Sequence, residues 1–175
     1  MRHLLLSERF QPRLDAISEQ ERIETVLLLA QHLQDEGKFY RIITPYDAQK
    51  NELERALKDA DLNWHDKCFN VDSFQGQYLV PTPPIVARNL HTKTGNEDDI
   101  IVISLVCSKT LGFLTSTRRT NVMLTRCKRG MYIVSSKAFL EGKGADSLVG
   151  KMAAELGKQP GAWLTHEDLR EGKFE

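Results

Sequence analysis

The segment that decides the fold is Ile100-Ile101-Val102-Ile103-Ser104-Leu105-Val106, a nearly continuous run of β-branched and apolar residues. A strand with one solvated face alternates apolar and polar residues, whereas a strand covered on both faces is apolar along its whole length. This run therefore predicts a central strand of a parallel sheet that is packed between helices.

Helical and strand patterns alternate on both sides of that run. The expected elements are a helix over 19–36, a strand over 39–44, a helix over 48–60, a strand over 68–71, a helix from Ser116 to about Lys128, a strand over 131–134 and helical segments over 138–141 and 147–156. Ser116 is a typical N-cap for the helix that is expected to run to about Lys128, and Gly130 is expected to end that helix. The alternation indicates an α/β fold with a mainly parallel sheet flanked by helices, whose ligands bind at the carboxyl ends of the strands.

Length and composition fit one globular domain. The chain has 175 residues, of which 41% are hydrophobic and 27% charged, which is ordinary for such a domain. The patterned part, residues 19–157, is taken as the domain, residues 1–18 as an N-terminal lead-in and residues 158–175 as a loosely attached C-terminal tail. We expect a monomer.

Compartment and metal binding follow from what the sequence lacks. No segment is long and apolar enough for a membrane span, and no signal-peptide cleavage pattern follows the first leucines. Cys68, Cys107 and Cys127 have no metal-ligand spacing and are interpreted as reduced thiols. We therefore expect an intracellular protein, cytoplasmic or nuclear, with no metal site and no membrane partner.

Charge is distributed unevenly although the net charge is zero. Between Asp99 and Glu141 the chain has no acidic residue but seven basic ones: Lys109, Arg118, Arg119, Arg126, Lys128, Arg129 and Lys137. A local positive field of this kind suits the phosphates of a nucleotide or of a nucleic acid. A solvated basic face is the equally plain alternative.

Three motifs follow one another in the same order as in a known family. They are Ile42-Ile43-Thr44-Pro45-Tyr46-Asp47-Ala48-Gln49, Val71-Asp72-Ser73-Phe74-Gln75-Gly76 and Arg118-Arg119-Thr120-Asn121-Val122-Met123-Leu124-Thr125-Arg126. Together they resemble motifs of superfamily 1B helicases, in particular the group of the nonsense-mediated-decay helicase and senataxin. The resemblance covers roughly residues 21–136 and implies the second of two RecA-like domains, with the fold of P-loop NTPases.

The resemblance assigns one set of residues to the nucleotide. Arg126 matches the catalytic arginine that reaches the ATP γ-phosphate across the cleft between the two domains, a role suited to a planar guanidinium. Gln75, Gly76 and Glu97 match a loop near the nucleotide. Arg119, seven residues before Arg126 on the expected helix, is assigned to the same pocket, with an ion pair to a carboxylate as the alternative.

A second set is assigned to the backbone of single-stranded RNA or DNA. Thr44, Pro45, Tyr46 and Ser73 match positions at which the family contacts the strand, and Arg118 and Asn121 are added from the third motif. Sugar and phosphate contacts carry no sequence information, as a translocating motor requires. For Tyr46 the alternative is a half-buried aromatic residue at a helix start, and for Arg118 a structural ion pair. The choice between RNA and DNA stays open.

Two departures from the family pattern limit these expectations. The printed sequence has no G-x-x-x-x-G-K-S/T phosphate loop and no D-E motif for Mg²⁺, so we expect ATP and Mg²⁺ to bind only together with an N-terminal RecA-like domain. In addition, Gln77 to Gly95 separates Gly76 from Glu97, which the family joins directly. This proline-containing segment is interpreted as a loop or disordered insertion, either lineage-specific or translated from a retained intron.

The sequence thus favours the C-terminal half of an ATP-dependent helicase, inactive in ATP hydrolysis alone. Two alternatives stay open. The first is a non-catalytic nucleic-acid-binding or scaffold module derived from a helicase. The second is a truncated gene product.

Overall fold

A computed structural model describes residues 2–6, 18–76, 97–105 and 111–173, with the backbone alone for 2–6, 75 and 76. The elements are β1 (Arg2–Leu6), α1 (Glu19–Asp35), β2 (Tyr40–Thr44), α2 (Asp47–Asp59), β3 (Cys68–Asn70), α3 (Val71–Gly76), β4 (Asp98–Ser104), the 3₁₀ helix η1 (Gly112–Thr115), α4 (Thr117–Leu124), β5 (Cys127–Val134), α5 (Lys137–Glu141), α6 (Leu148–Leu156), β6 (Trp163–Leu164) and α7 (His166–Arg170). The insertion proposed over 77–95 lies outside the described residues.

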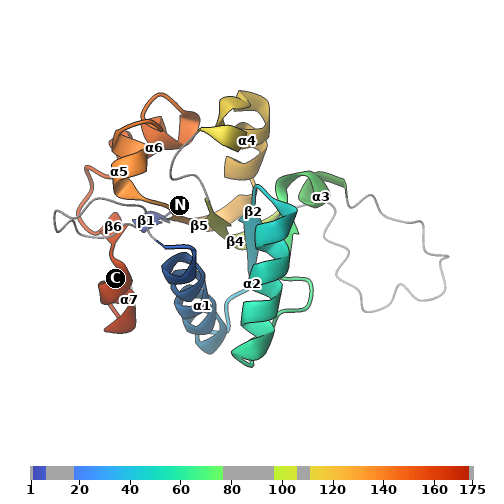
Figure 1. Ribbon diagram of the computed structural model, residues 1–175. Coiled ribbons are helices and arrows are strands. Elements are labelled where there is room, and N and C mark those ends of the chain that lie inside the picture. Colours follow the sequence, from blue (N-terminus) through green and yellow to red (C-terminus); the bar gives the residue numbers. More distant parts are fainter. Residues whose placement is uncertain (1, 7–17, 77–96, 106–110, 174–175) are drawn as a thin grey trace.

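The strands form one sheet in the order β3-β2-β4-β5-β1-β6, and every neighbouring pair is parallel. The connections through α1 and α2 run toward the β3 edge, whereas the later ones run toward the β6 edge. Right-handed crossovers in opposite directions place helices on opposite faces of a sheet. Figure 1 shows this arrangement, with α1, α2 and α7 on one side and α4, α5 and α6 on the other. The predicted α/β, RecA-like fold is confirmed.

Alternate residues of β4, together with Leu105 directly after it, pack into two separate apolar cores. Ile100 and Val102 pack with α1 and α2, whereas Ile101, Ile103 and Leu105 pack with α4, α5 and α6. Each of these side chains is at most 9% exposed. Because successive strand residues point to opposite faces, the apolar run that predicted a doubly covered strand also fixes where both cores lie.

The third expected helix is shorter than its sequence pattern suggested. Ser116 caps α4 as predicted, accepting a hydrogen bond from the backbone N–H of Arg119, but the helix ends at Leu124 rather than near Lys128. The chain then joins β4 as β5, and Asp98 donates a backbone hydrogen bond to the Arg126 carbonyl (3.1 Å). Gly130, expected as a helix stop, lies inside this strand. Pairing with β4 therefore overrides the helical pattern of 125–128.

The segments at the two ends of the chain are part of the sheet. β1 lies between β5 and β6, pairing with β5 along its whole length. The Thr25 hydroxyl lies 2.9 Å from His166 Nδ1, which joins α1 to α7. Strand pairing and helix packing thus join β1, from the expected lead-in, and β6 and α7, from the expected tail, to the domain expected over 19–157.

Candidate nucleic-acid interface and nucleotide edge

The predicted site residues lie at two opposite edges of the sheet. Thr44 ends β2, and Ser73 follows the end of β3 in the first turn of α3, so both lie at the carboxyl edge. Glu97 immediately precedes β4 and Arg126 immediately precedes β5, so both lie at the amino edge. The sheet thus separates Thr44 and Ser73 of the strand-binding set from Glu97 and Arg126 of the nucleotide-binding set.

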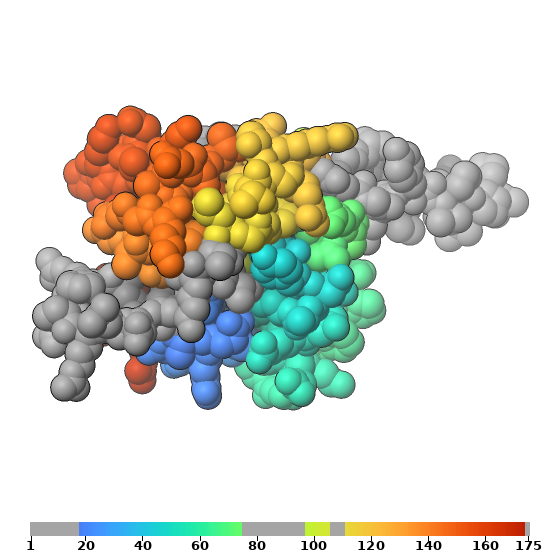
Figure 2. Space-filling model, turned by 45° about the horizontal axis from the view of Figure 1, so that its top comes forward, coloured from blue at the N-terminus to red at the C-terminus, as the bar shows by residue number. Residues whose placement is uncertain are grey.

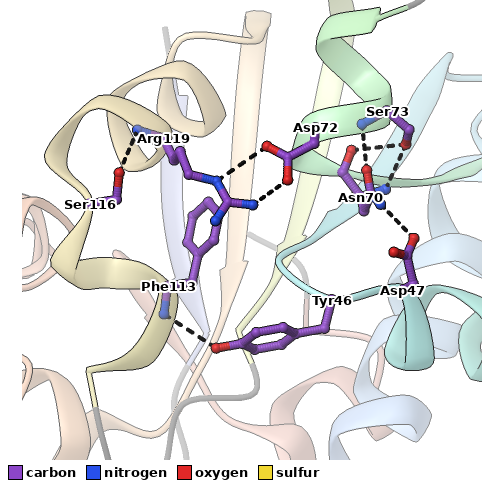
Figure 3. A network of polar contacts seen from close by, with 8 residues as sticks. All are labelled: Tyr46, Asp47, Asn70, Asp72, Ser73, Phe113, Ser116 and Arg119. Carbon is purple, nitrogen blue, oxygen red and sulfur yellow. Dashed lines mark hydrogen bonds and ion pairs between the residues drawn. The ribbon is translucent and has the colours of Figure 1, made fainter.

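The carboxyl edge carries a polar network that joins three segments (Figure 3). Tyr46, the N-cap residue of α2, is 42% exposed, and its hydroxyl accepts a hydrogen bond from the Phe113 backbone N–H (3.2 Å). Asp47 accepts a hydrogen bond from the Asn70 amide, and Asn70 accepts one from the Ser73 backbone N–H. The Ser73 side chain is exposed beside them. Tyr46 and Ser73 are therefore accessible to a ligand at this edge.

Thr44 and Pro45 lie beneath that surface. The Thr44 side chain is fully buried, and its hydroxyl donates a hydrogen bond to Gln49 Oε1. The Gln49 amide in turn donates to the Ser104 hydroxyl at the end of β4 (2.8 Å). Pro45 is buried as well. These polar groups satisfy one another inside the protein, so in this conformation only the backbone of the turn is left for a strand to contact.

Arg119 lies at the carboxyl edge together with Tyr46. Its guanidinium forms a two-pronged ion pair with Asp72 in the first turn of α3, with Nε 3.2 Å from Oδ1 and the second contact at Oδ2. It also lies over the Phe113 ring, 4.7 Å from the centroid. Arg118 and Asn121 are exposed on α4. In Figure 2, the yellow segment formed by η1 and α4 lies beside the start of α2 (cyan) and α3 (green); η1 contacts the N-cap residue of α2, and α4 contacts α3.

The expected proximity of Arg119 to Arg126 is not found. Arg119 lies in the first turn of α4, whereas Arg126 follows its last turn. The two arginines do not share one helix face, because the helix ends before Arg126. The alternative of an ion pair for Arg119 is the one that the structure displays, and no partner residue of Arg118 is seen in the described part of the chain.

Arg126 is partly buried and is held by the end of α4. Its Nε donates a hydrogen bond to the Val122 carbonyl (2.8 Å), which has no further helical partner at the end of the helix. Within the described ranges, neither terminal guanidinium nitrogen is engaged by an acceptor. The anchored Nε leaves these two donors as a fork that can bind a phosphate.

Two residues of the amino edge, Glu97 and Asp98, lie beside Arg126. Glu97 is exposed. Burial is the main cause that raises the pKa of the Cys127 thiol, and the negative charge of Glu97 raises it further. Asp98 pairs with Arg41 Nε (3.0 Å), and that guanidinium lies over the Phe69 and Phe74 rings. Gln75 and Gly76 end α3, and the structure describes only their backbone.

The β4–β5 pairing is irregular beside Arg126. Asp98 pairs with Cys127 but Ile100 pairs with Gly130, so Lys128 and Arg129 together oppose Asp99. Such a bulge turns both side chains outward, and both are exposed.

Sequence reasoning did not single out several residues of the two edges. Asp72 lies inside a quoted motif but was given no role, and its partner is 47 residues away. Gln49 likewise lies inside a quoted motif without an assigned role, whereas Phe113 and Arg41 carry no sequence signal of their own. In the described part of the chain no group of three or more metal-ligating side chains occurs, and no helix there is long and apolar enough to cross a membrane.

Comparisons with known proteins agree with this fold. Residues 85–138 match the family model of an AAA domain. An uncharacterized ATP-dependent helicase of Methanocaldococcus jannaschii is 31% identical over 121 residues, which cover 69% of this chain and 15% of the relative. DNA polymerase alpha-associated DNA helicase A of Saccharomyces cerevisiae is 32% identical over 59% of this chain and 13% of its own length. A putative regulator of nonsense transcripts 1 of Takifugu rubripes is 32% identical over 66% and 9%.

A RecA-like fold, the order of the three motifs and these matches define the class: the chain is a superfamily 1 helicase domain. Within that class it resembles the relatives that include regulator of nonsense transcripts 1 and DNA helicase A. The chain spans 15% or less of the length of these relatives.

Proposed function

We propose that this domain is the C-terminal half of an ATP-dependent RNA or DNA helicase. The observation that carries the proposal is the position of Arg126 at the amino edge beside Glu97. Its Nε is anchored, and its terminal nitrogens have no hydrogen-bond acceptor among the described residues. The carboxyl edge, on the other side of the sheet, presents Tyr46, Ser73, Arg118 and Asn121 for the backbone of a single strand.

The chemistry assigned to Arg126 is stabilisation of charge. Phosphoryl transfer spreads negative charge over the equatorial oxygens of the transferred group, and a guanidinium supplied from a neighbouring domain stabilises it. Mg²⁺ and the phosphates of ATP are held by a phosphate-loop domain, so this chain by itself does not turn over ATP. Gln75, Gly76 and Glu97 are proposed to line the nucleotide side of the same cleft.

Its test begins with the transcript. In-frame codons for a phosphate loop and a D-E motif upstream of Met1 support the helicase half, and transcripts from which the codons for 77–95 are absent support the intron interpretation of that segment. ATP hydrolysis is then measured for this chain alone, for the phosphate-loop domain alone and for both together, with and without single-stranded RNA or DNA.

Arg126→Ala is expected to lower the turnover number of the two-domain assembly by about 10³-fold or more, the range known for arginine fingers. Arg126→Lys is expected to recover little, because a lysine ammonium does not bind a phosphate in a bidentate manner. Arg170→Ala, which removes an exposed arginine of α7, is the control. If the isolated chain hydrolysed ATP and Arg126→Ala abolished that activity, the proposed inactivity of the isolated chain would be contradicted, whereas the proposed role of Arg126 would be supported.

A second candidate is a non-catalytic strand-binding module. It is favoured by the network at the carboxyl edge, which needs no residue from another domain. Strand binding by the isolated chain, combined with a transcript that encodes no phosphate-loop domain, would select this function over the first.

A further inference from the structure

Arg119 has the geometry of a phosphate-binding residue whose place is taken by a carboxylate. Its guanidinium contacts Asp72 through two nitrogens, which is also the way in which arginine binds a phosphate. The neighbours of the pair on this edge are Tyr46 and Ser73, the exposed residues assigned to the nucleic-acid backbone. Arg126, by contrast, lies beyond the other end of α4.

The Arg119–Asp72 pair is exposed and therefore exchangeable. The arginine side chain is 43% exposed and the aspartate side chain 60%. An ion pair in water at this exposure contributes little to stability, because solvent screens the attraction and two side chains lose conformational freedom. A pair of this strength is easily displaced by a competing anion.

The guanidinium is held in place by groups other than Asp72. It lies over the Phe113 ring (4.7 Å), and the Phe113 N–H is bound by the Tyr46 hydroxyl (3.2 Å). Ser116 also accepts a hydrogen bond from the Arg119 backbone N–H. Loss of the aspartate contact therefore leaves the cation oriented at the same place, ready for another acceptor (Figure 3).

We propose that Arg119 binds a backbone phosphate of single-stranded nucleic acid, and that Asp72 occupies the guanidinium until the strand displaces it. The inference rests on the strand-binding part of the proposed function, and it moves Arg119 from the nucleotide set to the nucleic-acid set. Asp72 then acts as an internal competitor that lowers strand affinity.

The test is fluorescence anisotropy of a labelled single-stranded oligonucleotide, oligo(U) and oligo(dT) in turn, titrated with the full chain at several salt concentrations. Arg119→Gln is expected to weaken binding about tenfold, as for loss of one charge-assisted contact. It should also lower the slope of log K against log salt by about 0.7, the value for one phosphate contact to a single strand. Asp72→Asn is expected to tighten binding about two- to fivefold, the range set by the strength of an exposed pair.

The double variant Asp72→Asn/Arg119→Gln separates the mechanisms. It should bind like Arg119→Gln, because Asp72 acts only through Arg119. Lys158→Gln, which breaks the exposed pair with Glu155 elsewhere on the surface, is the charge-matched control and should bind like the unchanged chain.

Two results would overturn the inference while leaving strand binding intact. One is weaker binding of Asp72→Asn, which would show that the pair only maintains the structure. The other is equal tightening by Asp72→Asn with and without Arg119, which would show general repulsion by the carboxylate. Absence of binding by the unchanged chain would overturn both this inference and the strand-binding part of the proposed function, whereas the ATPase experiments on Arg126 are independent of it.

Discussion

The Tyr40 hydroxyl illustrates how one polar atom enters the energetics of the core. It is buried against the α1 and α2 face of the sheet, and no hydrogen-bond partner for it exists among the described residues. Burial, with a smaller contribution from Cys68, raises the pKa of Tyr40 to about 12 from its ordinary value of 10.0. An unsatisfied hydroxyl of this kind costs free energy that a phenyl ring does not.

We expect Tyr40→Phe to raise the free energy of unfolding by about 1 kcal/mol at pH 8. The folded state keeps the proton of Tyr40 up to about pH 12, whereas the unfolded state releases it above about pH 10. Tyr40 therefore makes stability fall as the pH rises between these values. Urea unfolding at pH 8 and pH 11 should show a smaller loss for Tyr40→Phe. An equal loss in both proteins, or lower stability of the variant at pH 8, would contradict this account.

β1 is the element whose role was least expected. It fills the position between β5 and β6, with backbone hydrogen bonds to both. A parallel strand removed from inside a sheet leaves unpaired donors and acceptors on two neighbours, and each such group is costly when water does not replace the lost bond.

Removal of residues 1–6 is accordingly expected to abolish cooperative thermal unfolding, measured by circular dichroism. Removal of residues 172–175, which follow α7, is the control and should lower the midpoint by no more than a few degrees. A shortened chain that keeps its cooperative transition would show that β5 and β6 do not depend on β1.

Long patterned elements were predictable from the sequence, and short ones were not. The apolar run around Val102 fixed the central strand, and Ser116 fixed the start of α4. β6 has only two residues, so its strand identity comes from pairing with β1 rather than from a local pattern. The end of α4 was missed because the helical period continues to Lys128 while the chain already pairs with β4.

The sequence nominated candidate residues for the site, but it did not predict how their side chains contact one another. The pattern placed Tyr46 just after a strand, as found, whereas Arg126 was expected inside a helix and instead precedes β5 at the opposite edge of the sheet. The contact of Arg119 with Asp72 depends on tertiary packing across 47 residues, which a sequence pattern does not encode. Burial of Thr44 depends likewise on Gln49 and Ser104 lying beneath the same edge.

In the described part of the chain, two apolar cores share one sheet, and each of them contains one buried thiol. Cys68 packs on the α1 and α2 side and Cys127 on the α4 to α6 side. Burial raises the pKa of Cys68 to about 12 and also raises that of Cys127. Both thiols are therefore protonated and shielded at neutral pH, and only opening of the structure makes them reactive.

With Cys107 replaced by serine, Cys68 and Cys127 are expected to react with a thiol reagent at one common rate, because both cores open only when the shared sheet unfolds. Mass spectrometry of peptides taken during the reaction measures the two rates separately. Added denaturant should raise both rates in parallel. A Cys127 rate well above that of Cys68, independent of denaturant, would indicate that the α4 to α6 layer opens alone.

The placement of β1 has a consequence for synthesis on the ribosome. β1 leaves the exit tunnel before any other described element, yet its partners β5 and β6 are translated more than a hundred residues later. At about 5–20 residues per second, the nascent chain spends several seconds in which β1 has no neighbouring strand to pair with. Chaperone association during translation should therefore peak before Leu164 emerges.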